Sequence, residues 1–500
     1  MRLGAVRAPG LAAAAVVVLL VLTGCTTAGA STTTTGAGVP GDRRHVVEPT
    51  APATTCATVP AQVVMTGRTA SAADEAAPPD TARIQQALDR CAQEGGAVVA
   101  VHLVAGPLSS SFLSGPLTVH RGEVLLLDPA TTLYASRDAA DYQAPGQPTC
   151  GTVARRGGSS GCRPFITLRG GDDGLESTRA ADGSQGRVDG RGGLPVLGTT
   201  TSWWQLADTA KQDGGQQQVP RLVESEHSDD VFLHDVDLVD APGFNVSDEG
   251  GDGFTAWGVR IDEPATARNT DGIDPAGATD VTVTDSWIAD GDDGVAIKGG
   301  SAPSSHITVS DDHFYGTHGI SIGSETTAGV SDVLVTDDTV SGADPSGTPS
   351  EDSAGIRIKS DRKAGGVVDD VLYRDVCVAA VKAPIDVDPR YDDPSGPSES
   401  GAHVPWFTGI TVDGLTAVDS PTGATSTLDG YDDDHPLDLT LTGVSVDAPH
   451  VVVAHAHVSA SGTTFGGAPL PGATALTASA SGPGAAAPTC TFPAYPTPSP

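Results

Sequence analysis

The chain has 500 residues, of which 62 are Gly and 37 are Pro, while only 18% are charged and 4% aromatic. This composition argues against a long-helix or coiled-coil protein, which is rich in Leu, Glu and Lys. The 63 acidic residues outnumber the 28 Lys and Arg, and the formal net charge is −35. A surface this acidic repels nucleic acid phosphates and anionic lipids, so we expect no nucleic-acid partner.

The first 24 residues have the pattern of a bacterial export signal. Arg2 and Arg7 precede an apolar run from Leu11 to Leu22, which is too short to span a bilayer stably. The run ends at Cys25 in a sequence that resembles a lipoprotein processing site, where that cysteine carries the lipid. The alternative is an ordinary secretory signal with a chance cysteine. Either pattern predicts an exported protein, extracellular or held at the outer face of the cell membrane by this anchor alone.

The six cysteines that remain suit three disulfides in an exported chain. They are Cys56, Cys91, Cys150, Cys162, Cys377 and Cys490. Their pairing stays open, although Cys150 and Cys162 would close a short loop and Cys56 and Cys91 would tie down the start of the fold. No CxxC motif or His/Cys cluster suggests a structural zinc site, and we expect neither a metal nor a cofactor.

Low-complexity segments flank one long region without an evident linker. Residues 25–55 suit a flexible tether, and residues 471–500 form a Pro- and Ala-rich tail that Cys490 implies is tied down. We assign residues 56–470 to a single domain. One helix is expected near its start, with Asp80-Thr81 at the N-cap and Gly95-Gly96 after its end.

Short strands separated by Gly, Asp, Ser and Pro fill the rest of this domain, and they recur. A first series begins at Val281, Ile307, Val333, Val371 and Ile410, at intervals of 26, 26, 38 and 39 residues. Upstream we assign Val231 and Val259 to the same series. A second series begins at Val295, Ile320, Ile356 and Ile385.

Two or three strands in each repeat of about 25 residues predict an all-β fold, a parallel β-helix whose coils lie about 4.8 Å apart. A leucine-rich solenoid would need an L-x-x-L-x-L pattern, which is absent. A propeller would need four strands in about 40 residues, and the shorter repeats are too small for that. The helix after Asp80 would cap the open apolar end of the solenoid.

Four motifs fall at corresponding places of successive predicted coils. They are Asn269-Thr-Asp271-Gly, Gly291-Asp292-Asp293-Gly, Thr317-His318-Gly and Arg357-Ile-Lys359. Since each interval is about one coil, a β-helix brings three carboxylates, an imidazole and two cations onto one strip of surface. Arg357 and Lys359 stand two apart on a strand and therefore share its outer face.

Each motif also has an ordinary structural explanation. Asn-Thr-Asp-Gly and Asp-Asp-Gly both make good Asx turns, and an Arg-x-Lys pair on a strand is usually a solvated face. The composition favours a site nevertheless, because the chain has only two asparagines and five lysines. One asparagine, Asn269, and four of the lysines fall between residues 269 and 382. Cations gathered beside carboxylates in so acidic a protein indicate an anionic ligand.

These motifs resemble the NTDG, GDD, GHG and RIK pattern of polygalacturonases, glycoside hydrolase family 28, in order and in spacing. Matching segments are Thr266–Gly277, Asp290–Lys298, Gly319–Glu325 and Gly355–Asp361, and the likeness spans about residues 75–400. Gly294 stands where many members have Cys, and Thr317 replaces the usual Gly. The resemblance implies a right-handed, pectin-lyase-like β-helix and the hydrolysis of α-1,4-galacturonosidic bonds in polygalacturonate.

The resemblance also implies a role for each site residue. Asp292 would be the general acid, Asp271 and Asp293 would activate the attacking water, and His318 would hold the acid's orientation and protonation. Arg357 and Lys359 would bind galacturonate carboxylates. Tyr391 would stack on the substrate, and Asn269 is counted among the substrate-binding residues. An inverting hydrolase places its acid about 6.5–9.5 Å from its base, although the catalytic carboxylates of this family sit closer.

Other functions stay open on sequence alone. Asp clusters also bind Ca²⁺, so a calcium-dependent pectate lyase is one alternative. A non-catalytic carbohydrate-binding β-helix is another, although the intact Asp271, Asp292, Asp293 and His318 argue against it. A substituted galacturonan could be the substrate, and loops near 141–193 and 342–353 would decide between endo and exo action. We expect an endo-acting monomer whose partner is the galacturonan polysaccharide.

Overall fold

The computed structural model describes residues 44–92, 97–155, 160–391, 403–470 and 488–496. The predicted signal peptide at 1–24, the predicted lipidation site Cys25 and most of the predicted tether lie outside these residues. In the part of the chain that is described, no helix is both long and apolar enough to cross a membrane.

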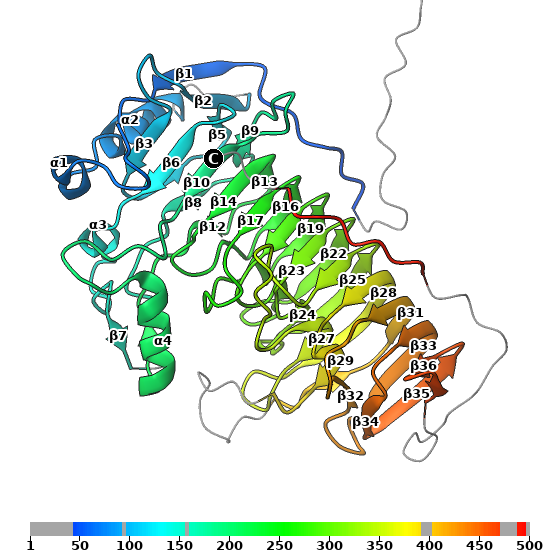
Figure 1. The fold of residues 1–500 in the computed structure, drawn as a ribbon. Helices are drawn as coiled ribbons and strands as arrows, with labels where there is room; N and C mark the ends of the chain where they lie inside the picture. Colours follow the sequence, from blue (N-terminus) through cyan, green and yellow to red (C-terminus); the bar gives the residue numbers. More distant parts are fainter. Residues whose placement is uncertain (1–43, 93–96, 156–159, 392–402, 471–487, 497–500) are drawn as a thin grey trace, which may run out of the picture. The chain divides into compact units, whose positions relative to one another are not determined.

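The described strands wind into a right-handed parallel β-helix, as predicted (Figure 1). One face is an eleven-stranded parallel sheet. Its strands are, in stacking order, β4 (Leu117–Val119), β8 (Ile166–Leu168), β12 (Val223–Glu226), β15 (Val246–Glu249), β18 (Ile273–Ala276), β21 (Val295–Ile297), β24 (Ile320–Ile322), β27 (Ala354–Lys359), β29 (Ala383–Asp388), β32 (Thr425–Asp429) and β34 (His450–Ala454).

Two further rows of strands complete each coil. The first row consists of β1 (Thr55–Pro60), β2 (Val99–Val104), β5 (Glu123–Leu127), β9 (Gly174–Ser177), β13 (Val231–His234), β16 (Asp252–Trp257), β19 (Thr279–Thr284), β22 (Ser304–Ser310) and β25 (Val330–Thr336). The second row consists of β3 (Ser111–Ser114), β6 (Thr132–Ala135), β10 (Gly186–Asp189), β14 (Val236–Val239), β17 (Arg260–Asp262), β20 (Trp287–Ala289), β23 (His313–Tyr315) and β26 (Thr339–Ser341).

Toward the C-terminus the two rows merge into long strands. These are β28 (Val367–Ala379), β31 (Ile410–Val418) and β33 (Leu437–Val446), followed by the shorter β35 (Ala456–Ser461), β36 (Thr464–Phe465) and β37 (Ala468–Pro469). The short strand β30 (Trp406–Phe407) pairs with the start of β28.

Residues in the left-handed region mark the corner between the two rows. Asp235, Asp285, Asp311 and Asp337 have φ between 49° and 63°, and Asp375 and Gly414 take the same place inside β28 and β31. Aspartate tolerates this conformation better than most residues because its short side chain can bond the local backbone.

The register confirms the predicted repeat. Val281, Ile307, Val333, Val371 and Ile410 are successive partners in the first row, and Val295, Ile320, Ile356 and Ile385 are successive partners in the eleven-stranded sheet. The assignment of Val259 to the first series is wrong. Val231 pairs with Phe254, which pairs with Val281, whereas the strand after Val259, β17, belongs to the second row.

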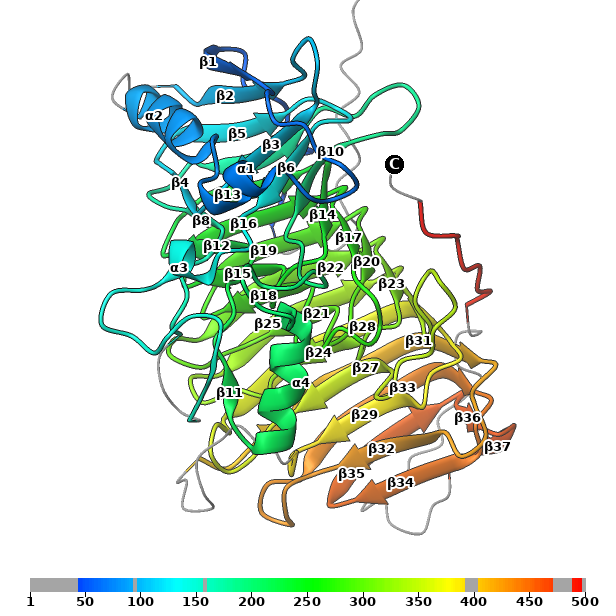
Figure 2. The ribbon, with the colours of Figure 1, turned by 60° about the vertical axis from the view of Figure 1, so that its left-hand side comes forward.

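The four described helices are α1 (Ala72–Ala76), α2 (Thr81–Cys91), α3 (Ala139–Tyr142) and α4 (Trp203–Asp213). The predicted helix is α2, which packs on β1, β2 and β4 with Ile84, Ala87 and Leu88 buried (Figure 2). Asp80 stands at its N-cap but makes no capping bond. Instead its carboxylate accepts the Leu113 N–H at 2.9 Å. The helix ends at Cys91, before the predicted Gly95-Gly96, which lie outside the described residues.

All six remaining cysteines form disulfides: Cys56–Cys91, Cys150–Cys162 and Cys377–Cys490. The last one holds the C-terminal residues 488–496, which run back along the coils (red in Figure 1). There the Tyr315 hydroxyl donates to the Pro493 carbonyl, and the Tyr495 hydroxyl donates to the Ile261 carbonyl. Residues 488–496 of the tail are therefore tied down, as Cys490 implied.

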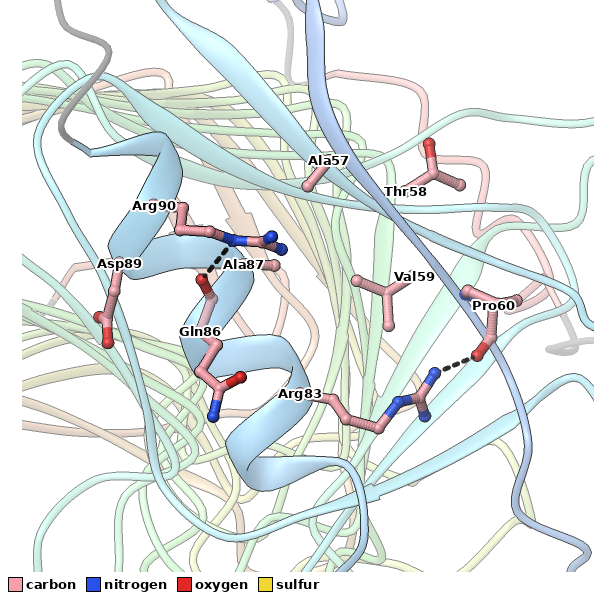
Figure 3. A pocket seen from close by; sticks show the side chains of 9 residues that line it. All are labelled: Ala57, Thr58, Val59, Pro60, Arg83, Gln86, Ala87, Asp89 and Arg90. Atoms are coloured by element: carbon pink, nitrogen blue, oxygen red, sulfur yellow. Dashed lines mark hydrogen bonds between the residues drawn. The ribbon is translucent and has the colours of Figure 1, made fainter.

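A hollow of about 480 Å³ lies between α2 and β1 (Figure 3). Two arginines of α2 border it. Arg83 donates to the Pro60 carbonyl at 2.8 Å, and Arg90 donates to the Gln86 carbonyl at 3.1 Å. None of the residues that the sequence proposes for a site lines this hollow.

Candidate active site

Three of the four motifs lie at the same place in successive coils, just before strands β18, β21 and β24 of the eleven-stranded sheet. Backbone bonds tie them together: the Gly272 N–H donates to the Asp293 carbonyl, and the Gly294 N–H donates to the Gly319 carbonyl. The stack therefore brings Asp271, Asp293 and His318 to one edge of the sheet, as the coil spacing predicted.

The fourth motif lies further along its coil. Arg357 pairs with Ser321, not with His318, so the prediction that all four motifs occupy corresponding places is wrong for this one. Its two cations instead project from the outer face of β27, where both contact one aromatic ring. The guanidinium carbon of Arg357 lies 5.1 Å, and the ammonium of Lys359 4.9 Å, from the centroid of Tyr391. The structure thus joins Tyr391 to the two cations.

Both asparagines of the chain support the first motif. The Asn245 side chain donates to the carbonyls of Thr270 and Asp271 at 3.2 and 3.3 Å. Asn269 has φ of 55°, a left-handed conformation that asparagine tolerates. Its amide nitrogen donates to Asp292 Oδ2 at 3.1 Å, while its amide oxygen accepts from Gln217 at 2.8 Å. Asn269 thus orients Asp292, and Gln217 fixes the amide.

Asp292 is held on both of its oxygens but keeps an open edge. Its Oδ1 accepts the Asp293 N–H at 3.1 Å and lies at the same distance, 3.1 Å, from His318 Nδ1. The side chains of Asp292 and His318 are 15% and 16% exposed, whereas those of Asp271, Asp274 and Asp293 are 6%, 2% and 3% exposed. A substrate atom can therefore reach this carboxyl group.

Asp293, by contrast, is buried and fully bonded. Ser321 donates to its Oδ1 at 2.7 Å, and Lys359 donates to its Oδ2 at 2.6 Å. Arg357 Nη1 lies 3.9 Å from the same carboxylate, and Arg357 Nε lies 3.0 Å from Asp386. Lys359 therefore links the carboxylate cluster to the ring of Tyr391.

Asp271 is the least satisfied carboxylate of the site. Its Oδ1 is buried without a hydrogen-bond partner among the described residues, and its Oδ2 lies 3.9 Å from Lys298. The Lys298 ammonium donates to Asp274 at 2.5 Å and lies 4.7 Å from the centroid of Phe244. An unpartnered carboxylate oxygen can accept a hydrogen bond from a water molecule.

Burial and neighbouring charges shift the pKa values of the site carboxyl groups in opposite directions. Burial, with Asp274 and Asp292 nearby, raises the pKa of Asp271 well above its usual range, and burial raises the pKa of Asp274 to about 6 despite Lys298. Burial acts to raise the pKa of Asp292 too, but His318 and Lys359 outweigh it and hold that pKa below its usual range.

The imidazole shifts in the opposite direction. Burial acts to lower the pKa of His318, but Asp292 and Asp293 outweigh it and raise that pKa. In the unliganded site the proton shared by this pair therefore sits on His318, one hydrogen bond from the carboxyl group that the resemblance makes the acid.

The two departures from the family pattern pack against each other. A Cβ at Gly294 would lie 2.4 Å from a ring carbon of Phe314 and 3.3 Å from the methyl group of Thr317. The space of the missing side chain is thus filled by these two residues. The Thr317 hydroxyl also accepts the Gly319 N–H at 3.0 Å, which supports the turn that carries His318.

Oxygen and nitrogen atoms of Asp292, Asp293 and His318 all lie within 4.8 Å of one another. The expected separation of about 6.5–9.5 Å is therefore wrong for Asp292 and Asp293, which are consecutive residues of one turn. The donor set fits a calcium ion poorly. Ca²⁺ takes 6–8 oxygen ligands, and here the Lys359 ammonium occupies one oxygen of Asp293.

Comparisons with known proteins agree with this geometry. Residues 176–461 match the model of glycosyl hydrolases family 28. The chain belongs to this family. An endo-polygalacturonase of Pectobacterium parmentieri is 38% identical over 369 residues, 73% of this chain and 84% of that protein. A polygalacturonase of Ralstonia nicotianae is 35% identical over 481 residues, 86% of each.

A solved polygalacturonase from Erwinia carotovora ssp. carotovora has the same fold, with a TM-score of 0.71 and 35% identity. The match covers 83% of this chain and 99% of that one. The family 28 fold thus accounts for most of the described coils.

The sequence missed several residues of this family 28 site. Gln217 and Ser321 bond the predicted residues Asn269 and Asp293 directly. Asp274 and Phe244 contact Lys298 instead. Lys298 belongs to a matching segment, but its ammonium was given no role. The signal that could have paired Lys298 with Asp274 is their separation of 24 residues, about one coil.

Proposed function

We propose that this family 28 chain is an endo-acting polygalacturonase that hydrolyses α-1,4-galacturonosidic bonds in polygalacturonate. The observation that carries the proposal is the juxtaposition at one sheet edge of two carboxyl groups. Asp292 is partly exposed and paired with His318, and Asp271 has an unpartnered oxygen. Hydrolysis of a glycoside needs one carboxyl group that gives a proton and one carboxylate that activates water.

Asp292 donates the proton to the glycosidic oxygen in this proposal. The proton reaches it from His318, whose Nδ1 lies 3.1 Å away. In the free site Lys359 helps to keep Asp292 ionised. A galacturonate carboxylate bound beside that ammonium offsets its charge and adds a negative one, and both effects raise the pKa of Asp292. Substrate binding thus favours the protonated acid.

Asp271 and Asp293 act on the attacking water. The Asp271 carboxylate, which accepts no hydrogen bond from the described residues, accepts one from the attacking water, and the raised pKa of Asp271 makes this carboxylate a stronger base once ionised. Asp293 is saturated by Ser321 and Lys359, which suits a positioning role better than proton transfer. Attack by water rather than by a carboxylate inverts the anomeric centre.

The substrate contacts follow from charge and shape. Arg357 and Lys359 form a cationic pair against Tyr391, and we assign galacturonate carboxylates to the pair and a sugar ring to the aromatic face. Arg can bind a carboxylate with two hydrogen bonds, whereas Lys supplies a point charge. Asn269 serves the substrate through the orientation of Asp292, and its exposed atoms can also reach the sugar.

We further propose that the chain is exported and acts as a monomer outside the cell. Residues 1–24 would direct export, and Cys25 would carry a lipid that holds the enzyme at the outer face of the membrane. Radiolabelled palmitate incorporation into the wild type, but not into Cys25→Ser, tests the anchor. A wild type without label would contradict it.

The test of the activity is digestion of polygalacturonate with products separated by length and followed by NMR. The proposal expects a ladder of oligomers early in the reaction, saturated ends and inverted anomers. Monomer or dimer alone would contradict endo action, and unsaturated ends would identify a lyase. A retained anomer in fresh product would contradict the inverting mechanism.

A further inference from the structure

A second cluster of ionisable side chains lies on the first row of strands, away from the eleven-stranded sheet that carries the catalytic carboxylates. His234 ends strand β13 with its side chain 8% exposed. Its Nδ1 lies 2.9 Å from Oε1 of Glu176 on the neighbouring strand β9. Glu176 is 1% exposed, and its second oxygen is buried without a hydrogen-bond partner in the described part of the chain.

The other imidazole nitrogen faces two more carboxylates. His234 Nε2 lies 3.4 Å from Oε1 of Glu48 and 3.8 Å from Oδ2 of Asp235. The three donor atoms of Glu48, His234 and Asp235 all lie within 4.8 Å of one another. Four zinc ligands at about 2.0–2.1 Å in a tetrahedron are separated by roughly 3.4 Å. The two spacings from His234 Nε2, 3.4 and 3.8 Å, are therefore close to those of ligands around one such ion.

The segment that supplies Glu48 is held in place independently of the cluster. Arg44 donates from Nη1 to the Phe254 carbonyl at 2.8 Å and to the Thr255 hydroxyl at 3.0 Å on strand β16. This segment, residues 44–54, leads into β1 and runs along the first row of strands (dark blue in Figure 1). Glu48 therefore meets His234 through an ordered contact, even though its own side chain is 60% exposed.

In the described residues, carboxylates outnumber the cations that pair with them around His234. Burial acts to lower the pKa of His234, but Glu176, Asp235 and Glu48 outweigh it and raise that pKa, so a proton on the imidazole offsets one of the charges. Asp235 is paired through its other oxygen with Arg179 and Gln185, and Asp285 interacts with Glu48 and Asp235. Glu48, Glu176, Asp235 and Asp285 thus bring four carboxylates to one guanidinium. A partly buried excess of negative charge requires a cation or protons.

We propose that Nε2 of His234 and one carboxylate oxygen each of Glu48 and Asp235 bind a divalent transition metal of the zinc type. One imidazole nitrogen and two carboxylate oxygens suit Zn²⁺ better than Ca²⁺ or Mg²⁺, which prefer oxygen alone. Glu176 holds the ring from behind. A carboxylate that accepts from Nδ1 fixes the tautomer with a free lone pair on Nε2, the usual arrangement behind a metal-binding histidine.

The metal would join the segment at residues 44–54 to the coil that contains β13. Glu48 comes from that segment, whereas His234 and Asp235 come from the end of one strand and its corner. The site is separate from the catalytic carboxylates, so its occupancy bears on attachment of this segment and leaves the hydrolytic step untouched.

The test is titration of the chelator-treated full-length chain with ZnCl₂ at pH 7.5, followed by calorimetry. A catalytic-site variant, His318→Gln, serves as the background because Asp292, Asp293 and His318 could also take up zinc. We expect one equivalent of tightly bound Zn²⁺ in that background, no competition from a tenfold excess of CaCl₂, and at least about tenfold weaker binding in Glu48→Gln.

Glu48→Gln changes an exposed side chain and is expected to fold, which circular dichroism checks. The matched control is His306→Gln, since His306 also lies between two aspartates, 3.2 Å from Asp280 and 3.4 Å from Asp332, but on the exposed surface. It should bind zinc like its parent. No binding in the His318→Gln background, equal binding in Glu48→Gln, or displacement by calcium would each overturn the proposal.

Discussion

The Nδ1 atom of His318 lies 3.1 Å from Oδ1 of Asp292, and the His318 backbone N–H donates to the Asp292 carbonyl at 2.6 Å. Two contacts between the same two residues, one from the backbone and one from the side chain, fix the ring against the carboxyl group. The opposite pKa shifts of the two groups follow from this contact. The two residues therefore share one proton across this contact.

Replacing the proposed acid with asparagine should abolish proton donation and leave the shape of the site unchanged. Asp292→Asn keeps the acceptor for Asn269 or Asp293 but cannot give a carboxylic proton, so kcat on polygalacturonate should fall at least about 10²-fold. On an aryl galacturonide with a dinitrophenol leaving group, which needs no protonation, most of the activity should return.

Asp271→Asn distinguishes the proposed base from the acid. This variant should be slow on both substrates, because water activation is needed whatever the leaving group. Asp438→Asn, on the exposed face of β33, is the control and should match the wild type. Rescue of Asp271→Asn, instead of Asp292→Asn, by the activated substrate would reverse the two assignments.

The pH profile of the hydrolysis should depend on His318. Its pKa is raised by Asp292 and Asp293, so the pair keeps its proton to a pH above the ordinary 6.5 of histidine, and activity should fall as pH rises through the raised value. His318→Asn removes the proton store, and the alkaline limb of the kcat profile should then move to lower pH. An unchanged alkaline limb would show that the proton comes from another group.

Lys298 should govern the opposite limb of the profile. Its positive charge lowers the pKa of Asp271 against the effect of burial. Lys298→Met should therefore raise that pKa, and the acidic limb of kcat/KM should move upward by about one pH unit. Lys382→Met is the matched control, since that exposed ammonium donates to the Glu351 carbonyl instead of to a carboxylate of the site. Equal profiles for the two variants would remove Lys298 from the site.

Lys359→Ala should separate substrate binding from catalysis. Loss of a hydrogen bond to a charged group should weaken polygalacturonate binding by about 1.5–3 kcal/mol. It should change inhibition by fully methyl-esterified pectin far less, because that polymer has no free carboxylate. Asp293 loses its buried partner as well, so kcat should fall too. A KM that is unchanged, or an equal loss with both polymers, would contradict carboxylate recognition.

The stability of the protein should decrease as pH rises through the range from about 4 to 7. Burial raises the pKa of Asp248 and of Glu123 to about 7, and those of Asp173 and Asp237 to about 6. The folded state then binds protons that the unfolded state has released, so the slope of stability against pH is negative in this range.

Asp248→Asn tests this slope with an uncharged side chain of similar shape. The slope of the unfolding free energy between pH 5 and 7, measured by urea titration, should become less negative by up to roughly 1.4 kcal/mol per pH unit. Asp352→Asn should retain the wild-type slope. A stability that rises with pH in the wild type would contradict the assignment of these buried acids.

The repeat was predictable because each coil has a strand that begins with Val or Ile at a corresponding position. The partners Val281, Ile307, Val333, Val371 and Ile410 could be aligned by interval alone. Val259 misled the alignment because the second row of strands has the same pattern as the first. The left-handed corner that separates the two rows in this coil is Gly258, with φ of 66°. A single glycine is common in loops as well, so the sequence alone did not reveal this corner.

The site was predictable where it followed the coils and unpredictable where it did not. Asp271, Asp293 and His318 stack because each precedes a strand of one sheet. Gln217 comes from the strand pair β7 (Val153–Ala154) and β11 (Gln216–Gln217), in an insertion whose position depends on tertiary packing. The proton's preference for His318 depends on burial and on Lys359 together, which no local pattern records.

The C-terminal residues 488–496 change how the coils can unfold. In a solenoid each repeat normally contacts only its neighbours, so the end can fray one repeat at a time. Here Cys490 is bonded to Cys377 on β28, and Tyr495 reaches Ile261 on β17, so one short peptide spans the coils that carry the catalytic loops. Fraying from the C-terminal side must therefore detach this peptide before it reaches those coils, and we expect the coils between β17 and β28 to unfold together.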